Sequence, residues 1–189
     1  MDVALLRVFQ RQVYLQLQAL LVAVHDFNSA MTTNDMNHAW IAIQNILTAA
    51  ANVSKALWGS KGKRTDKRAS LRESLQVDDS SPLRDVVMRN HFEHYDERLD
   101  TWWRESEAHN HFDISVMPPS AMEGLADIDM FRVFDPTTGD VVFWGERFNI
   151  KAIATEAGRL LPIANAEASK PHWEEPPPSE SASTSGGGQ

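Results

Sequence analysis

Cysteine is absent from the 189 residues of the chain. This absence excludes a disulfide framework, a cysteine-ligated zinc site and a catalytic thiol, and it is typical of a reducing compartment. Long apolar runs are also lacking, since the most apolar window, residues 13–24, contains Gln16 and Gln18 and is too short to cross a bilayer. The N-terminus, MDVALLRVFQ, has no basic leader and no small-residue cleavage site. We expect a soluble, cytoplasmic protein with no membrane contact.

Positive charge is scarce, because 18 Lys and Arg face 26 Asp and Glu and give a net charge of −8. This balance argues against a broad nucleic-acid-binding surface. Basic residues nevertheless gather between Gly59 and Arg72, where Asp66 is the one acidic residue. If the protein binds RNA, the backbone phosphates are expected to meet the cations of this loop, Lys61, Lys63, Arg64, Lys67 and Arg68.

Apolar residues three and four apart predict two long helices, over residues 2–27 and 35–58, joined by a polar turn at 28–34. Ser81 and Pro82 predict the start of a third helix, over 82–107, because serine caps free N–H groups and proline fits the first helical position. Residues 150–161 predict a last helix, which Pro162 is expected to end.

Valine, phenylalanine and isoleucine are frequent on either side of the turn sequence PTTG, residues 136–139, which predicts a β-hairpin over about 127–145. From residue 165 onward, proline, serine, glycine and glutamate predominate, and such a segment buries too little apolar surface to fold. The sequence therefore predicts one mainly α domain over residues 1–164, with a small appended β-hairpin and a disordered C-terminal tail over 165–189.

Polar residues cluster inside the predicted third helix, in the stretch RNHFEH at positions 89–94. On a helical wheel, one stripe forms the expected core face, and it consists of Met88, Phe92, Tyr95, Leu99 and Trp102. Arg89 and His94 fall on opposite flanks, about 140° apart. A second stripe, made of Leu83, Val87, Asn90 and His94, predicts a contact surface for a symmetric homodimer.

The stretch RNHFEH resembles the signature of HEPN domains, in which an arginine and an adjacent polar residue precede a histidine. Here these residues are Arg89, Asn90 and His94. The resemblance covers roughly residues 1–108 and implies an antiparallel helical bundle that dimerises and acts as a metal-independent endoribonuclease without a cofactor. It also implies a toxin–antitoxin or anti-phage setting, with an antitoxin protein as a partner. The tyrosine that some of these toxins carry two residues after the histidine is Asp96 here, which argues against regulation at that position.

The residue types suit RNA cleavage through attack of the 2′-hydroxyl on the adjacent phosphate. Histidine transfers protons near neutral pH, because its ordinary pKa is about 6.5. Arginine presents planar donors that match phosphate and favours a more anionic transition state. Asn90 is placed to orient His94 or to donate to a phosphate oxygen. Because one straight helix separates Arg89 from His94, we expect a dimer to supply groups from both chains.

Three alternatives stay open. A non-catalytic module for dimerisation, or for binding nucleotide or RNA, would use the same helix without cutting. A metal hydrolase would draw its ligands from four histidines and a carboxylate, which are His91, His94, His109, His111 and Asp96 or Asp113. A solvated helix face would use Arg89 and His94 only in surface ion pairs.

Overall fold

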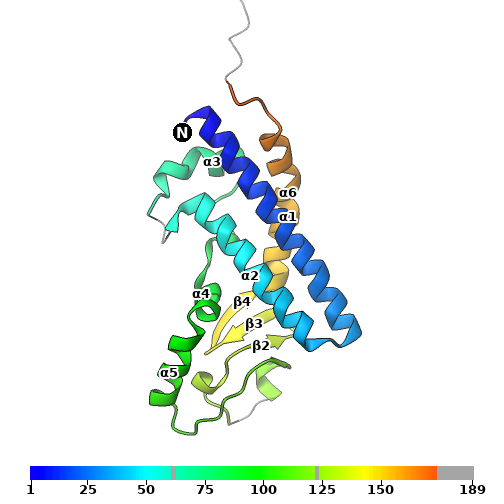
Figure 1. Ribbon diagram of the computed structural model, residues 1–189, viewed down its shortest axis with the longest axis vertical. Coiled ribbons are helices and arrows are strands. Elements are labelled where there is room, and N and C mark those ends of the chain that lie inside the picture. Colours follow the sequence, from blue (N-terminus) through cyan, green and yellow to red (C-terminus); the bar gives the residue numbers. More distant parts are fainter. Residues whose placement is uncertain (61–62, 122–123, 174–189) are drawn as a thin grey trace, which may run out of the picture.

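The computed structural model describes residues 1–60, 63–121 and 124–173 (Figure 1). These residues form a mainly helical fold with a small mixed sheet. Its α-helices are α1 (Val3–Thr33), α2 (Met36–Trp58), α3 (Ala69–Ser74), α4 (Val87–Glu93), α5 (Tyr95–Glu105) and α6 (Ile150–Ala168). Its strands are β1 (Ser115–Val116), β2 (Val133–Asp135), β3 (Asp140–Phe143) and β4 (Glu146–Asn149), and short 3-10 turns include η2 (Asp66–Arg68), η3 (Pro82–Arg84) and η5 (Asp127–Asp129).

The first two helices form an antiparallel pair, as their spacing predicts (Figure 1). The polar turn predicted at 28–34 is wrong, because α1 continues to Thr33 and buries Phe27 and Ala30 on its inner face. The chain reverses in two residues instead. Asn34 adopts a left-handed conformation with φ 57°, and the carboxylate of Asp35 accepts a hydrogen bond from the His38 N–H at 3.1 Å.

Helix α6 packs along α1 (Figure 1). The prediction that Pro162 ends this helix is wrong, since α6 continues to Ala168. Proline removes the N–H that would bond to the carbonyl of Gly158, four residues earlier. Both Pro162 and Gly158 are exposed, so water can bond to that carbonyl. The opposite face stays buried through Leu160 and Ala164, which holds the helix together past the proline.

The third predicted helix, over 82–107, is wrong as a single element, because the structure divides it into η3, α4 and α5. Ser81 does not cap it, and its hydroxyl donates to Glu156 Oε1 at 3.0 Å. The extended backbone of Asp85 separates η3 from α4, and its carboxylate accepts from the Val87 N–H at 2.8 Å. A second break falls at His94, with φ −108° and ψ 39°, between α4 and α5.

The sheet has the strand order β1-β2-β3-β4. The predicted hairpin is confirmed for β2 and β3, which pair antiparallel around the turn at 136–139. Residues 127–132 are not part of a strand, and β4 and the two-residue β1 were not predicted. One group of side chains, including Phe134, Val141 and Phe148, joins the helical core, whereas Val133 and Val142 pack with Met130 in a second cluster. The sheet is therefore covered on both faces.

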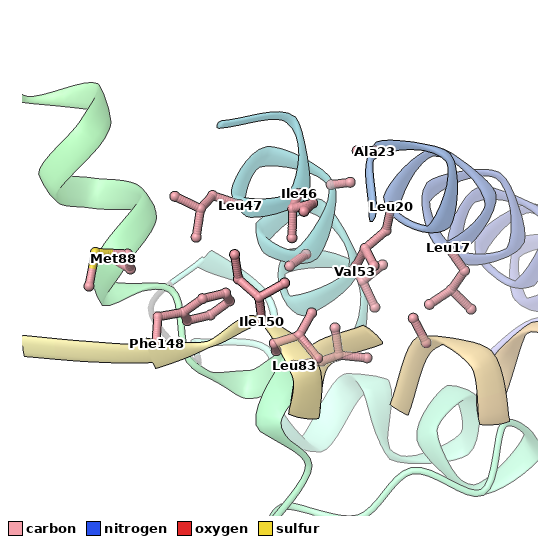
Figure 2. Packing of buried hydrophobic residues seen from close by; sticks show 14 of the residues in the cluster. Leu17, Leu20, Ala23, Ile46, Leu47, Val53, Leu83, Met88, Phe148 and Ile150 are labelled. Carbon is pink, nitrogen blue, oxygen red and sulfur yellow. The ribbon is translucent and has the colours of Figure 1, made fainter. Parts of the chain in front are cut away.

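The main core lies where α1, α2, α6 and the sheet meet (Figure 2). Leu20 of α1, Ile46 of α2 and Ile150 of α6 are buried there. Leu83 is fully buried in the same cluster, so the predicted dimer stripe that begins at Leu83 is wrong. The helical wheel fails at this position because η3 and α4 are separate elements. The predicted core face is confirmed, since Met88 is buried and the other four residues pack partly buried against the core.

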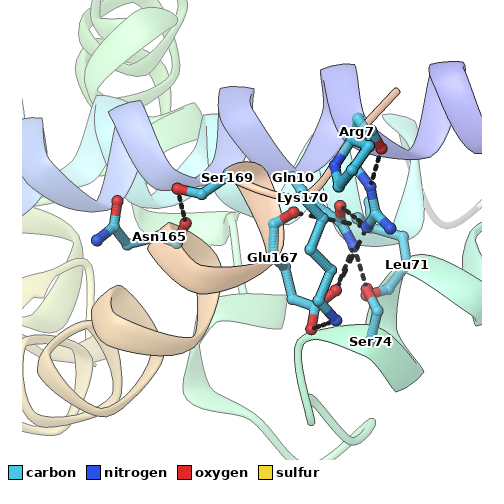
Figure 3. A network of polar contacts seen from close by, with 9 residues as sticks. Arg7, Gln10, Leu71, Ser74, Asn165, Glu167, Ser169 and Lys170 are labelled. Atoms are coloured by element: carbon cyan, nitrogen blue, oxygen red, sulfur yellow. Dashed lines mark hydrogen bonds and ion pairs between the residues drawn. The ribbon is translucent and has the colours of Figure 1, made fainter. Parts of the chain in front are cut away.

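A buried polar network joins the two ends of the described chain (Figure 3). The Gln10 side chain is fully buried in α1, and its amide donates to Ser74 Oγ at 2.8 Å and to Glu167 Oε2 at 3.3 Å. Arg7 donates to the Gln10 amide oxygen at 2.7 Å and to the carbonyl of Pro171 at 3.0 Å. Residues 165–171 are thus held against α1, and the predicted disordered tail begins too early in the sequence. Residues 174–189 of that predicted tail lie outside the described residues.

Candidate functional site

The predicted site residues Arg89, Asn90 and His94 line one pocket of about 470 Å³. The pocket lies between the last turns of α2, which contribute Lys55 and Trp58, and the chain from η3 through α4. Ser54 fixes this junction, because its hydroxyl donates to the carbonyl of Arg84 at 3.1 Å. The two walls of the pocket come from residues 54–60 and 84–94. The pocket therefore forms only when these two segments pack together.

Arg89 is the least exposed charged group of the predicted motif. Its side chain is 19% exposed, and its guanidinium forms an ion pair with Glu93, one helical turn later. Its Nε is buried and has no hydrogen-bond partner in the described part of the protein. A buried N–H without a partner is costly, so this guanidinium has hydrogen-bonding capacity that the described residues leave unused.

His94 lies at the break between α4 and α5, and its side chain is 51% exposed. Its Nδ1 is 3.4 Å from Glu97 Oε1. This break overturns the expectation that one straight helix holds Arg89 and His94 apart. A straight helix would direct Arg89 and His94 to opposite flanks, whereas the interrupted chain lets both line the same pocket. A second chain is therefore not needed to bring these two groups to one ligand.

Asn90 lies between these two charged residues and is partly buried. Its backbone carbonyl accepts from the His94 N–H at 3.0 Å, which closes the last turn of α4. Asn90 therefore has two roles. It lines the pocket, and its backbone carbonyl accepts the hydrogen bond that ends α4 at His94.

Two further cations line the pocket and were not identified from the sequence. They are Lys55 of α2 and Arg84 of η3. Arg84 is 3.6 Å from Asp79, which offsets part of its charge. Lys55 and Arg84 are distant from RNHFEH in the sequence, so a motif search cannot find them. With Arg89 they place three cationic side chains in the lining of the pocket, which suits an anionic ligand.

The predicted basic segment begins at this pocket, since Gly59 and Ser60 belong to its lining. Lys61 lies outside the described residues, and Lys63, Arg64 and Lys67 are exposed. Arg68 differs from them. Its guanidinium lies over the Phe9 ring at 3.5 Å, and its pKa is lowered by burial and by Arg64. Arg68 therefore packs against α1 and is less available to a ligand than the exposed cations of the segment.

His91 is a packed histidine. Its ring stacks on Phe143 at a centroid distance of 4.7 Å, and Arg98 Nε donates to its Nδ1 at 3.1 Å. Burial, followed by the nearby Arg98 charge, lowers the pKa of His91. The ring is thus neutral near pH 7, and its proton is assigned to Nε2 because Nδ1 accepts.

Two of the histidines proposed as metal ligands, His109 and His111, contact other groups of the protein. His111 Nε2 is 3.2 Å from the Tyr95 hydroxyl, and His109 Nε2 is 2.9 Å from the carbonyl of Trp103. Across residues 1–60, 63–121 and 124–173, no group of three or more His, Asp or Glu side chains gathers with the geometry of a metal site. The arrangement required for the metal-hydrolase alternative is not found there.

Another polar cluster, outside the motif, joins Tyr95 of α5 to Asp113 and Arg132. The Tyr95 hydroxyl donates to Asp113 Oδ2 at 2.9 Å, and Arg132 forms two hydrogen bonds with the same carboxylate. Burial and the bond to Asp113 raise the pKa of Tyr95. Burial opposes ionisation of Asp113, but its bonds with Arg132 and Tyr95 lower its pKa overall. Because every member has a partner, this cluster fixes α5 to the sheet.

None of the helices in the described ranges is long and apolar enough to cross a membrane. No protein-family model, no curated protein and no solved structure matches the chain at a significant level. The function must therefore be argued from the site itself.

Proposed function

We propose that the protein is a metal-independent endoribonuclease whose active site is the pocket lined by Arg89, Asn90 and His94. The observation that carries this proposal is that the three residues line one pocket together with Lys55 and Arg84. An RNA phosphodiester is an anion of matching charge, and arginine is the side chain best suited to contact its oxygens. The resemblance of RNHFEH to the HEPN signature supports the same reading.

In this mechanism the 2′-hydroxyl of RNA attacks the adjacent phosphorus. The new O2′–P bond replaces the bond from phosphorus to the 5′-oxygen, which leaves a cyclic phosphate and a free 5′-hydroxyl. His94 moves one of the two protons, either from the 2′-hydroxyl or to the leaving 5′-oxygen, and solvent water takes up or supplies the other. Arg89 stabilises the negative charge that grows on the phosphoryl oxygens, and Asn90 positions the phosphate. Glu93 forms an ion pair with Arg89, and Glu97 Oε1 lies 3.4 Å from His94 Nδ1, so bound RNA would compete with both contacts.

The Arg89–Glu93 ion pair also favours a second candidate, an RNA- or nucleotide-binding module that does not cut. A guanidinium that remains paired to a carboxylate can attract an anion but is less free to stabilise the charge of a transition state. The two candidates differ in one observable, because only the enzyme produces shortened RNA. The toxin or anti-phage setting, and an antitoxin partner, remain proposals that rest on the HEPN resemblance.

The test is cleavage of single-stranded RNA in excess EDTA by the wild type and by His94→Ala and Arg89→Ala. We expect each substitution to reduce the cleavage rate by about 100-fold or more, as removal of a catalytic proton donor or charge stabiliser does. Matched controls are His38→Ala and Arg104→Ala, which remove an exposed histidine and an exposed arginine outside the pocket. These controls should cleave like the wild type.

Each outcome separates the candidates. Cleavage in EDTA that is lost with His94 and retained in both controls supports the enzyme. RNA that binds in a gel-shift assay but is never shortened, with or without added Mg²⁺ or Mn²⁺, supports the binding module. Cleavage that survives His94→Ala and Arg89→Ala rules out this pocket as the active site.

A further inference from the structure

Helix α1 carries an apolar surface that no described residue covers. Val8, Leu15 and Val22 are 58%, 44% and 60% exposed, and they are spaced seven residues apart. This spacing places them on one side of the helix, opposite the buried face that packs on α2 and α6. Between Val8 and Val24, α1 has a single charged residue, Arg11. Three exposed aliphatic side chains in one row are typical of a protein contact surface.

A groove of about 290 Å³ runs beside this row, between α1 and α2. Its lining includes Ala19, Ala23 and Ala49, and Val22 and Asp26 border it. The small alanine side chains leave room for a larger side chain from outside. The surface thus has both projecting side chains, such as Leu15, and a recess that fits one.

We propose that this surface of α1 binds the same surface of a second copy, with the two α1 helices antiparallel. In the register that brings Leu15 opposite Val22, Arg11 of each copy lies opposite Asp26 of the other. The Leu15 side chain of each copy then enters the groove beside Val22 and Ala19 of the other. Opposite charges on either side of the Leu15–Val22 pair are self-complementary only in this antiparallel arrangement.

This interface is different from the one that the sequence predicts, because Leu83 is buried and unavailable. It is also independent of the proposed endoribonuclease, since Arg89, Asn90 and His94 line their pocket within one chain. A dimer without cleavage, or cleavage without a dimer, is therefore a distinguishable result.

The test is the mass of the full-length protein by analytical ultracentrifugation over a range of concentrations. The expected species is a dimer with twice the 21.2 kDa mass of one chain. Leu15→Glu should weaken the dimer by about tenfold or more, because it places charge in an apolar contact. The matched control is Val87→Glu, because Val87 is 45% exposed, almost equal to Leu15, but lies on α4. This variant should remain dimeric.

A charge exchange tests the register. Arg11→Glu and Asp26→Arg should each weaken the dimer, because each places like charges opposite one another twice per dimer. The double variant should restore the dissociation constant to within about threefold of the wild type, since the pairs are again opposite. A protein that stays monomeric at about 100 μM would overturn the proposal, as would a dimer that is insensitive to Leu15→Glu. Failure of the double variant to recover would overturn the antiparallel register.

Discussion

At the scale of single residues, the stretch RNHFEH contains two histidines with different environments. His91 is stacked and accepts a hydrogen bond, whereas His94 is half exposed at a helix break. The same residue type is therefore structural at one position and a catalytic candidate three residues later. The difference follows from which side of α4 meets the sheet.

His91 should make the stability of the fold dependent on pH. Its pKa is lowered in the folded state, so between that value and about 6.5 the unfolded chain binds more protons than the folded one. Stability therefore rises with pH through this window and is lost as the pH falls. We expect the urea midpoint to decrease from pH 7.5 to pH 5.5, and to decrease less in His91→Phe, which keeps the ring stack.

The change of the urea midpoint with pH is compared between the wild type and His91→Phe. A difference between them isolates His91, because the remaining histidines are present in both proteins. His38→Phe serves as the control, since this histidine is exposed. An equal decrease in the wild type and in His91→Phe would show that His91 does not contribute to the pH dependence.

At the scale of elements, the helices show which features a sequence reveals. The spacing of apolar residues identified α1 and α2, because each buries one continuous face in the core. Residues that commonly mark the start or end of a helix were less reliable guides. Pro162 does not end α6 and Ser81 does not cap a helix, since contacts with α1 and Glu156 decide both positions. The motif residues were named from the sequence, but Lys55 and Arg84 were not, because only tertiary packing brings them to the pocket.

Pro162 makes α6 a helix with one missing backbone hydrogen bond. Replacing Pro162 with alanine restores the N–H donor at an exposed position and removes the clash of the ring with the preceding turn. We expect Pro162→Ala to increase the free energy of unfolding by about 1–3 kcal/mol. Chemical denaturation measures this change. A destabilised variant would show instead that the kink imposed by proline is needed for packing on α1.

At the scale of the whole molecule, a small group of polar contacts near the N-terminal end of α1 joins segments that are far apart in the sequence. Gln10 reaches α3 through Ser74 and α6 through Glu167. The sheet is the other connection, because its two faces link the helical core to the chain between α5 and β2. Strand β1 was not predicted because its partner β2 is distant in the sequence, with Ser115 paired to Val133. Strand β4 follows β3 directly, but its sequence, ERFN, is mostly polar and lacks a strand pattern.

The network around Gln10 should contribute to global stability. Gln10→Ala removes a buried side chain and the hydrogen bonds that it forms with Arg7, Ser74 and Glu167, which is expected to cost about 2–3 kcal/mol. Gln18→Ala, at an exposed position of the same helix, should change stability by less than about 0.5 kcal/mol. Urea unfolding followed by circular dichroism measures both. Equal effects of the two substitutions would contradict a structural role for the network.

The packing of α6 against α1 has a consequence for synthesis of the chain on the ribosome. Arg7 and Glu167 are 160 positions apart, so α1 emerges long before its partner α6 is made. The α1–α2 pair can form early, because both helices lie within the first 58 residues. Its remaining apolar face stays uncovered until α6 leaves the exit tunnel. Nascent chains that are stopped before residue 150 should therefore depend on chaperones until α6 is made and packs on α1.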